Sequence, residues 1–217
     1  MDSLNRHEDY GHEALYEMHL LTDPIEQFKD WLREAEAAEI YEPNAFVLGT
    51  VDAQNQSRSR TVLLKGVDQR GFFFATNYSS RKGEAVANNP SVSAVFGWYP
   101  IYRQVLVQGV VEKVEPSEST EYFHSRPHES QVAAWSSHQS QPIESRAALD
   151  EQFAQALAKF RNSDVPRPEY WGGYRIVPTR IEFWKGRSNR MHDRIEFART
   201  FNADGSLTDW KSQRLQP

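Results

Sequence analysis

Three groups of residues in this 217-residue chain have types and spacings that could do chemistry. The first group is basic and combines Arg58, Arg60 and Lys65 with the pair Arg81 and Lys82. On a strand, Arg58 and Arg60 share one face and Lys65 lies on the opposite face. The pair lies where a helix is predicted to begin, so cationic side chains meet free backbone N–H groups, a combination that suits a phosphate. A solvated edge strand with surface charges is the alternative.

The second group is Tyr122, Arg126 and Ser130, at four-residue spacing within TEYFHSRPHESQ. This spacing would place the three side chains on one helical face, but Pro127 pushes Arg126 out of the helical region. A helix end is therefore expected to meet a helix start. The hydroxyls and the guanidinium fit a phosphate ester, and a surface helix pair with a hydroxyl cap is the alternative.

The third group is the run Arg190-Met191-His192-Asp193-Arg194. If the run is extended, Arg190, His192 and Arg194 point to one side. Two guanidiniums beside an imidazole repel each other unless an anion or an electron-rich ring lies between them, so a functional interpretation is favoured. A surface pair of Asp193 with an arginine and an ordinary buried histidine are the alternatives. A turn over residues 185–189 would bring Trp184 near this row.

The hydrophobic pattern predicts the elements that position these groups. Asp23 and Pro24 start a helix, and a cap at Ser117 starts another through Phe123. Further helices are predicted over 79–88, from Pro127 to about 136, and over 145–161. Strands are predicted over 45–51, 60–67, 71–76, 91–98, 103–114, 175–184, 191–200 and 207–214, the first three as an antiparallel meander. This count of six to eight strands suggests a small, mainly β (α+β) barrel with peripheral helices.

Composition narrows the class of protein. The 25 basic and 30 acidic residues give a net charge of −5, which disfavours binding to nucleic acid or to an anionic membrane. No apolar run is long enough to span a membrane, no signal peptide is recognisable, and there is no cysteine. We expect a cytoplasmic protein with a flexible arm over 1–22 and a single domain over 23–217. No HExxH, GxGxxG, GxxxxGK[ST] or GxSxG motif is present, so no metal, Rossmann, Walker or hydrolase site is expected.

Several strings resemble the pyridoxamine 5′-phosphate oxidase family. They occur in the family's order and cover about nine-tenths of the chain. The strings are RTVLLK (60–65), FFFATNYSSRK (72–82), RQVLVQG (103–109), EYFHSRPHESQ (121–131), SHQS (137–140), IEFWKGRSNRMHDR (181–194) and RLQP (214–217).

The resemblance implies an FMN-binding split β-barrel that forms a homodimer with FMN at the subunit interface. The implied reaction oxidises pyridoxine or pyridoxamine 5′-phosphate to pyridoxal 5′-phosphate, with O₂ as acceptor and H₂O₂ as product. The implied FMN contacts are Arg60, Thr61, Val62, Leu63, Leu64, Lys65, Ala75, Thr76, Arg81, Lys82, Gln104, Gln139, Ser140, Trp184 and Arg194. The implied substrate contacts are Lys65, Tyr122, Arg126, Ser130, Arg190, Met191 and His192, of which Arg190 and His192 would be catalytic.

The chain departs from the family pattern at two places. Lys185 replaces the residue usual in the signature, and the arm offers only Arg6 and Tyr10 for an arginine and a tyrosine that often cover the active site. A non-catalytic flavin or pyridoxal phosphate carrier of the same fold is the closer alternative function. A protein-interaction barrel without cofactor is the more distant one.

Overall fold

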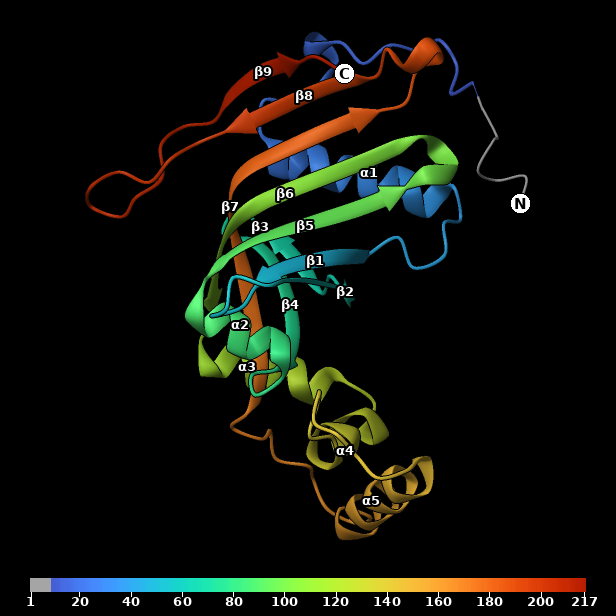
Figure 1. The fold of residues 1–217 in the computed structure, drawn as a ribbon, viewed down its shortest axis with the longest axis vertical. Coiled ribbons are helices and arrows are strands. Elements are labelled where there is room, and N and C mark those ends of the chain that lie inside the picture. The colour runs from blue at the N-terminus through green and yellow to red at the C-terminus, as the bar shows by residue number, and fades with distance from the viewer. Residues whose placement is uncertain (1–8) are drawn as a thin grey trace.

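The computed structural model describes residues 9–217, so Arg6 lies outside the described part. Within that part, nine strands form one curled antiparallel sheet in the order β2-β1-β5-β6-β7-β4-β3, and β8 and β9 extend it from one end of β7 (Figure 1). The strands are β1 (Ala45–Val51), β2 (Ser57–Leu63), β3 (Gly66–Asp68), β4 (Gly71–Asn77), β5 (Ser91–Trp98), β6 (Arg103–Lys113), β7 (Trp171–Lys185), β8 (Asp193–Ala198) and β9 (Lys211–Leu215). The predicted mainly β, α+β barrel is confirmed.

Five α-helices lie around the sheet. They are α1 (Pro24–Ala37), α2 (Arg81–Asn88), α3 (Pro116–Ser125), α4 (His128–Ser136) and α5 (Arg146–Lys159). Three predicted helix starts have a physical cap, because Asp23, Ser80 and Ser145 each accept a backbone N–H of the first turn. Two predicted starts are wrong by a residue or more. Helix α3 begins at Pro116 rather than after Ser117, and Pro127 precedes α4 instead of opening it.

The antiparallel pairings expected of the meander are confirmed, because β1 pairs with β2 and β3 pairs with β4. Strand β1 lies between β2 and β5, whereas β4 pairs with β3 and β7. The predicted strand over 60–67 is divided in two, because the chain leaves the ladder at Leu64 and Lys65. The Leu64 side chain enters the core there, while its backbone N–H and C=O bond Asn44. The predicted strands over 191–200 and 207–214 are also shorter, and β7 is longer than the predicted 175–184.

Strand β7 is the element that divides the sheet. It pairs with β6 along most of its length, with β4 from Trp171 to Ile176, and with β8 from Arg180 to Lys185. Its start therefore belongs to the end of the molecule that carries α3 and α4, and its finish belongs to the opposite end (Figure 1). One strand thus connects two separate regions.

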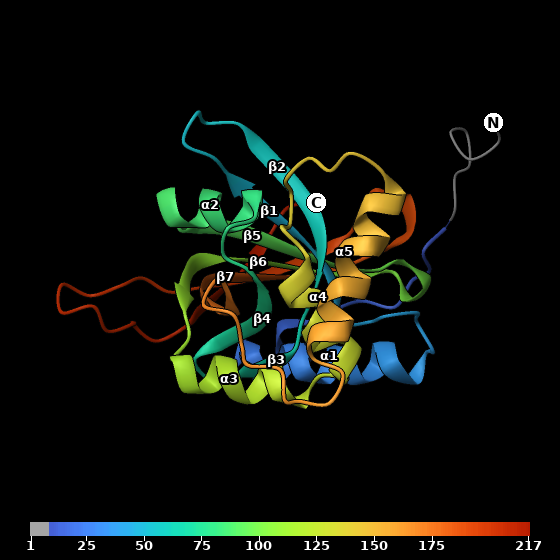
Figure 2. The ribbon, with the colours of Figure 1, turned by 90° about the horizontal axis from the view of Figure 1, so that it is seen from below.

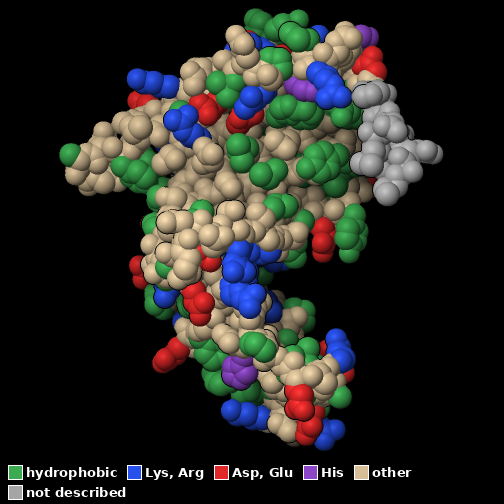
Figure 3. All heavy atoms as spheres, in the orientation of Figure 1, with side chains coloured by type: hydrophobic (Ala, Val, Ile, Leu, Met, Phe, Trp, Pro, Cys, Tyr) green, Lys and Arg blue, Asp and Glu red, His purple; other side chains and the backbone are tan. Residues whose placement is uncertain are grey.

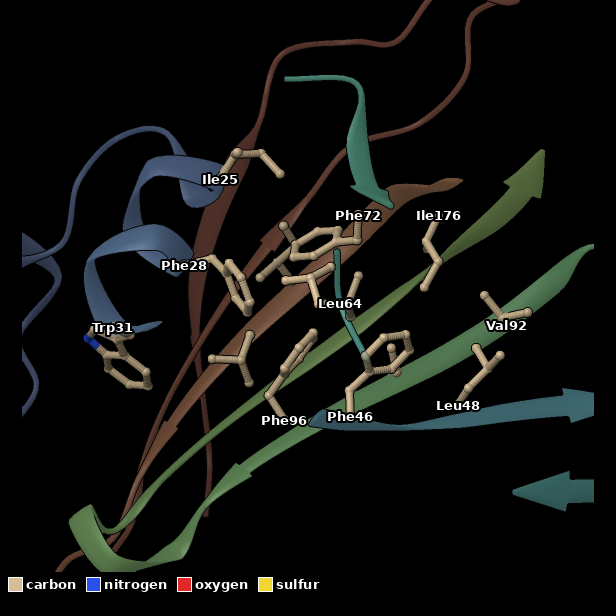
Figure 4. Packing of buried hydrophobic residues seen from close by; sticks show 14 of the residues in the cluster. Ile25, Phe28, Trp31, Phe46, Leu48, Leu64, Phe72, Val92, Phe96 and Ile176 are labelled. Carbon is tan, nitrogen blue, oxygen red and sulfur yellow. The ribbon is translucent and has the colours of Figure 1, made fainter. Parts of the chain in front are cut away.

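The main core lies between α1 and the concave face of the sheet (Figure 4). Phe28 of α1 is fully buried, and its ring centroid lies 4.8 Å from those of Phe72 and Phe96. A second, smaller cluster joins α3, α4 and α5 to Trp171 at the start of β7. Viewed from below, α4 and α5 cover this end of the barrel (Figure 2). The fold therefore places helices α3 and α4 beside the start of β7, and a turn between β7 and β8 at its other end.

Candidate active site

A cavity of about 630 Å³ opens between the sheet and helices α3 and α4. It is the meeting point of two groups that lie far apart in the sequence. The implied flavin contacts that line it are Thr61, Val62, Leu63, Lys65, Ala75, Thr76, Lys82 and Gln139. The implied substrate contacts that line it are Lys65, Tyr122, Arg126 and Ser130. The fold therefore brings residues of both predicted phosphate-binding groups to one cavity.

A neighbouring cavity shares Lys82 with the first and is lined by Arg58, Ser59, Arg60, Arg81 and Ser140. Ser80 caps α2 beside it, and the Arg81 backbone N–H donates to the Ser140 hydroxyl at 3.3 Å. The 137–141 segment thus lies against the start of α2. Arg58, Arg60 and Arg81 therefore lie together at this helix start, with Lys82 between the two cavities.

Five of the six cations that line these two cavities lack acidic partners within residues 9–217, and the sixth, Arg58, pairs with Asp52 at 3.6 Å. Within residues 9–217, none of the following is in an ion pair: Arg60, Lys65, Arg81, Lys82 and Arg126. Figure 3 shows Lys and Arg side chains gathered beside the hollow between the sheet and the lower helices. Five unpaired cations around these two adjoining cavities make the region suitable for binding an anion.

Three of these cations are partly buried, namely Arg60, Lys82 and Arg126. The Lys82 ammonium donates to the Thr76 hydroxyl at 3.0 Å and to the Gln139 side-chain oxygen at 2.5 Å. Burial, with Arg60 nearby, lowers the pKa of Lys82 to about 8. One terminal nitrogen of Arg126, Nη1, is buried without a hydrogen-bond partner. Burial also lowers the pKa of Arg126 from its usual value. Lys82 and Arg126 both gain from an anionic ligand, because it would supply the missing charge partner.

An aromatic wall holds the second group in place. The Tyr122 ring stacks parallel to the Trp171 indole, with centroids 6.1 Å apart, and the Arg126 guanidinium carbon lies 4.6 Å from the Trp171 ring. These contacts fix the guanidinium without using its donors. The sequence reasoning missed Trp171 as a site residue. The available signal was its position in a Trp-Gly-Gly string. In the structure, Gly172 lies so close to Tyr78 that a side chain at this position would collide with it.

The remaining predicted residues lie elsewhere. Gln104, Trp184, Arg190, Met191, His192 and Arg194 line neither cavity. Gln104 is paired with Trp184, and Trp184 with Arg194, where β6, β7 and β8 run side by side. The centroids of Trp184 and His192 are 4.8 Å apart, as the predicted turn over 185–189 required. We call this cluster of six residues the second half-site, and the residues that line the 630 Å³ cavity the first half-site.

The expected extended run from Arg190 is wrong. Residues Ser188–Arg190 form a 3₁₀ turn, Asn189 and Arg190 have φ of 56° and 59°, and the strand begins only at Asp193. Arg194 is also less available than expected, because it makes two hydrogen bonds to the Glu182 carboxylate and one to the Gln216 carbonyl. Of this group, Arg190 and Met191 remain exposed.

Residues 9–17 of the arm contact the second half-site. The Tyr10 ring lies 5.0 Å from Tyr102, 5.7 Å from His192 and 6.3 Å from Trp184 between centroids. The arm is tied down by Lys185, which pairs with Glu13 at 2.6 Å, so the residue that departs from the signature has a partner.

The two half-sites lie at opposite ends of β7 in one chain (Figure 1). Trp171 lines the cavity and Trp184 lies beside His192, and thirteen residue steps separate them. At about 3.3 Å per residue, this is a path of about 40 Å along the strand. None of the six residues of the second half-site lines the cavity that holds the first.

Two absences can be stated for residues 9–217. No group of three or more His, Cys, Asp or Glu side chains there could hold a metal ion. No helix in that part of the chain has the length and apolarity needed to cross a membrane.

Comparison with known proteins gives two family matches. A family described as pyridoxamine 5′-phosphate oxidase matches residues 32–160. A second, described as the pyridoxine 5′-phosphate oxidase C-terminal dimerisation region, matches residues 171–217.

Individual relatives cover nearly the whole chain. A pyridoxine/pyridoxamine 5′-phosphate oxidase of Salinibacter ruber is 47% identical over 97% of this chain and 96% of its own. One of Hahella chejuensis is 47% identical over 100% of this chain and 99% of its own. The crystal structure of PhzG from Burkholderia lata, in complex with tetrahydrophenazine-1-carboxylic acid, has a TM-score of 0.86 and 31% identity, covering 94% and 98%. A pyridoxamine 5′-phosphate oxidase-related, FMN-binding protein of Nostoc punctiforme shares the fold, with a TM-score of 0.67 and 13% identity, covering 91% and 100%.

Proposed function

This chain belongs to the pyridoxamine 5′-phosphate oxidase family, and we propose that it oxidises pyridoxine or pyridoxamine 5′-phosphate to pyridoxal 5′-phosphate with FMN and O₂. The observation that carries the proposal is the pair of adjoining cavities lined by five unpaired cations, since both FMN and the substrate are phosphate esters.

The residues of the structure fit FMN. The orphaned Arg126 Nη1 and the partly buried Lys82 require anions, and the two adjoining cavities offer room for two phosphates. Arg60, Arg81 and Lys82 would hold the flavin phosphate at the start of α2, while Thr61, Val62 and Leu63 lie along the cavity wall. Ala75, Thr76, Gln139 and Ser140 complete this set. Leu64 supports it only from the core, because its side chain is buried there.

When bound, FMN supplies the redox chemistry: it accepts a hydride from the substrate's 4′-carbon and passes the electrons to O₂, giving H₂O₂. The chain supplies position and charge. Tyr122, Arg126, Ser130 and Lys65 would hold the substrate phosphate, and the Tyr122–Trp171 stack would keep the guanidinium aimed into the cavity. Holding the substrate in one orientation is the main contribution that such a clamp makes to the rate.

The second half-site would come from a partner subunit. Gln104, Trp184 and Arg194 would face the flavin, and Arg190, Met191 and His192 the substrate, across the interface of a homodimer. Three observations support this arrangement. The half-sites are about 40 Å apart along β7 in one chain, residues 171–217 match a dimerisation region, and Val47 and Met191 are exposed apolar side chains. A twofold axis would bring the first half-site of each subunit against the second half-site of its partner.

A spectrum of the purified protein tests the proposal. We expect a flavin absorbance that is released on denaturation as FMN, and that is bleached under anaerobic conditions by pyridoxine 5′-phosphate. Unphosphorylated pyridoxine at the same concentration is the matched control and should bleach it far less. A flavin that binds but is not bleached would favour the carrier alternative, and a colourless protein that takes up no FMN would contradict the proposal.

A further inference from the structure

The His192 ring has one nitrogen that the protein occupies and one that it leaves open. The backbone N–H of Arg187 donates to His192 Nδ1 at 3.1 Å. Within residues 9–217, Nε2 makes no hydrogen bond. A backbone N–H can only donate, so Nδ1 must carry a lone pair, and the proton of a neutral ring must then be on Nε2.

The turn that provides this N–H is held by the arm. Ser188 donates its N–H and its hydroxyl to the Gly11 carbonyl, at 3.0 Å and 2.8 Å. The Arg187 side chain lies 3.7 Å from the buried Asp193 carboxylate. Ser188 and the Arg187 side chain are both held by these contacts. The backbone N–H of Arg187 is therefore kept in position to donate to His192.

The Asp193 carboxylate is directed away from the imidazole. It accepts the Leu15 N–H at 2.9 Å and an Arg214 N–H at 2.6 Å. A histidine that works as a general base usually donates Nδ1–H to such a carboxylate, which stabilises the imidazolium. His192 has the opposite arrangement, because its Nδ1 accepts.

The other groups around the ring also disfavour a positive charge. Arg187 and Arg190 come shortly before His192 in the chain, and their positive charges would repel an imidazolium. Burial and the charge of Arg190 lower the pKa of His192 below its usual value. These surroundings therefore favour the neutral form of the ring.

From this geometry we propose that His192 serves the reaction as a fixed Nε2–H hydrogen-bond donor and takes up no proton, and that the Arg187–Ser188 turn is the positioning element that sets this tautomer. The inference rests on the proposed function for its role in the reaction. The proton that the substrate's 4′-hydroxyl or amine loses, as its 4′-carbon gives up a hydride to FMN, then passes to water and not to His192.

Nitrogen-15 NMR of the histidine-labelled holoenzyme at pH 7 tests the tautomer directly. The chain has seven histidines, and the signals of His192 are identified by their loss in His192→Gln. We expect a protonated Nε2 and an unprotonated Nδ1. A protonated Nδ1, or an imidazolium, would overturn the proposal. This readout does not depend on turnover, so it stands even if the oxidase assignment fails.

A matched pair of variants tests the role in the reaction. Glutamine places an amide N–H near the position of Nε2 and cannot take up a proton, whereas asparagine can only replace Nδ1. We expect His192→Gln to keep at least about a tenth of the turnover, since a neutral hydrogen bond is worth about 1 kcal/mol, and His192→Asn to fall at least about tenfold below it. If His192 is a general base, both variants should lose about 10²–10⁴-fold alike, and the proposal fails. Flavin content is measured for both variants, and the NMR result decides if His192→Gln does not fold.

Discussion

The two half-sites of this chain use their charges in opposite ways. Around the cavity, Lys65, Lys82 and Arg126 have no acidic partner within residues 9–217. At the other end of β7, Arg194 is held by Glu182, and Arg214 by Asp193 and Glu17.

This difference separates binding from positioning. An unpaired, partly buried cation is costly in the empty protein and is stabilised when an anion arrives. A paired cation such as Arg194 already has a carboxylate partner, so it contributes less charge to a ligand and also fixes the local geometry. We therefore expect substitutions in the cavity to change affinity, and substitutions at the paired end to change stability or geometry.

The largest effect is expected from Lys82→Ala. Removing a charge-assisted hydrogen bond to the flavin phosphate should cost about 2–3 kcal/mol, so FMN should bind about a hundredfold more weakly. The free energy of unfolding of the flavin-free protein should not fall, because the lysine has no charge partner there. Fluorescence titration with FMN and chemical denaturation measure the two quantities. An unchanged FMN affinity would remove Lys82 from the binding set.

Arg126→Ala should act on the substrate and not on the flavin. We expect the affinity for pyridoxine 5′-phosphate to fall about thirtyfold, with the flavin-to-protein ratio near that of the unsubstituted protein. Unphosphorylated pyridoxamine is the control, and its oxidation should barely change. If the variant loses flavin but still prefers the phosphorylated compound, the two phosphate positions have been exchanged.

Glu182→Ala tests the paired end. It leaves Arg194 without its carboxylate, and because that guanidinium is one-third exposed the expected loss of unfolding free energy is only about 1–2 kcal/mol. FMN affinity should change far less than in Lys82→Ala. A thermal melt with and without FMN distinguishes the two. An effect on affinity alone would break the division between the two ends.

The smallest effect near neutral pH is a pH dependence of FMN binding. Burial lowers the pKa of Lys82 in the empty site to about 8. The bound phosphate favours the charged lysine, so its pKa is higher in the complex, and binding should weaken about tenfold per pH unit above about 8. Lys82→Arg is the matched variant, because arginine stays charged and should remove this limb. The measurement is a titration series from pH 7 to 10, and a flat profile for the unsubstituted protein would contradict the assignment.

Local sequence signals predicted the helices well, because a cap such as Asp23 or Ser145 acts within one turn. The pairing of strands that lie far apart in the sequence could not be predicted from local signals. The turns between neighbouring strands predicted the β1–β2 and β3–β4 pairs, but no local signal predicted that β1 also pairs with β5, about forty residues away.

The same limit applies to the site. Spacing identified Arg126 and Lys82 as anion-binding candidates, but not that Trp171 would fix the guanidinium. Nor could it foresee the turn at Asn189 and Arg190, because the arm's Gly11 carbonyl, far away in sequence, captures Ser188. Contacts between distant segments decided what local patterns could not.

The central claim is that one active site combines the cavity of one chain with the His192 end of another. Arg126→Ala breaks the first and His192→Ala the second, and each homodimer should be nearly inactive at low substrate concentration. After unfolding, mixing in equal amounts and refolding with FMN, half of the dimers are mixed, and each mixed dimer has one intact site, so about a quarter of the full activity should return. If the mixture is no more active than the average of the two variants, the half-sites do not join across subunits and the account is wrong.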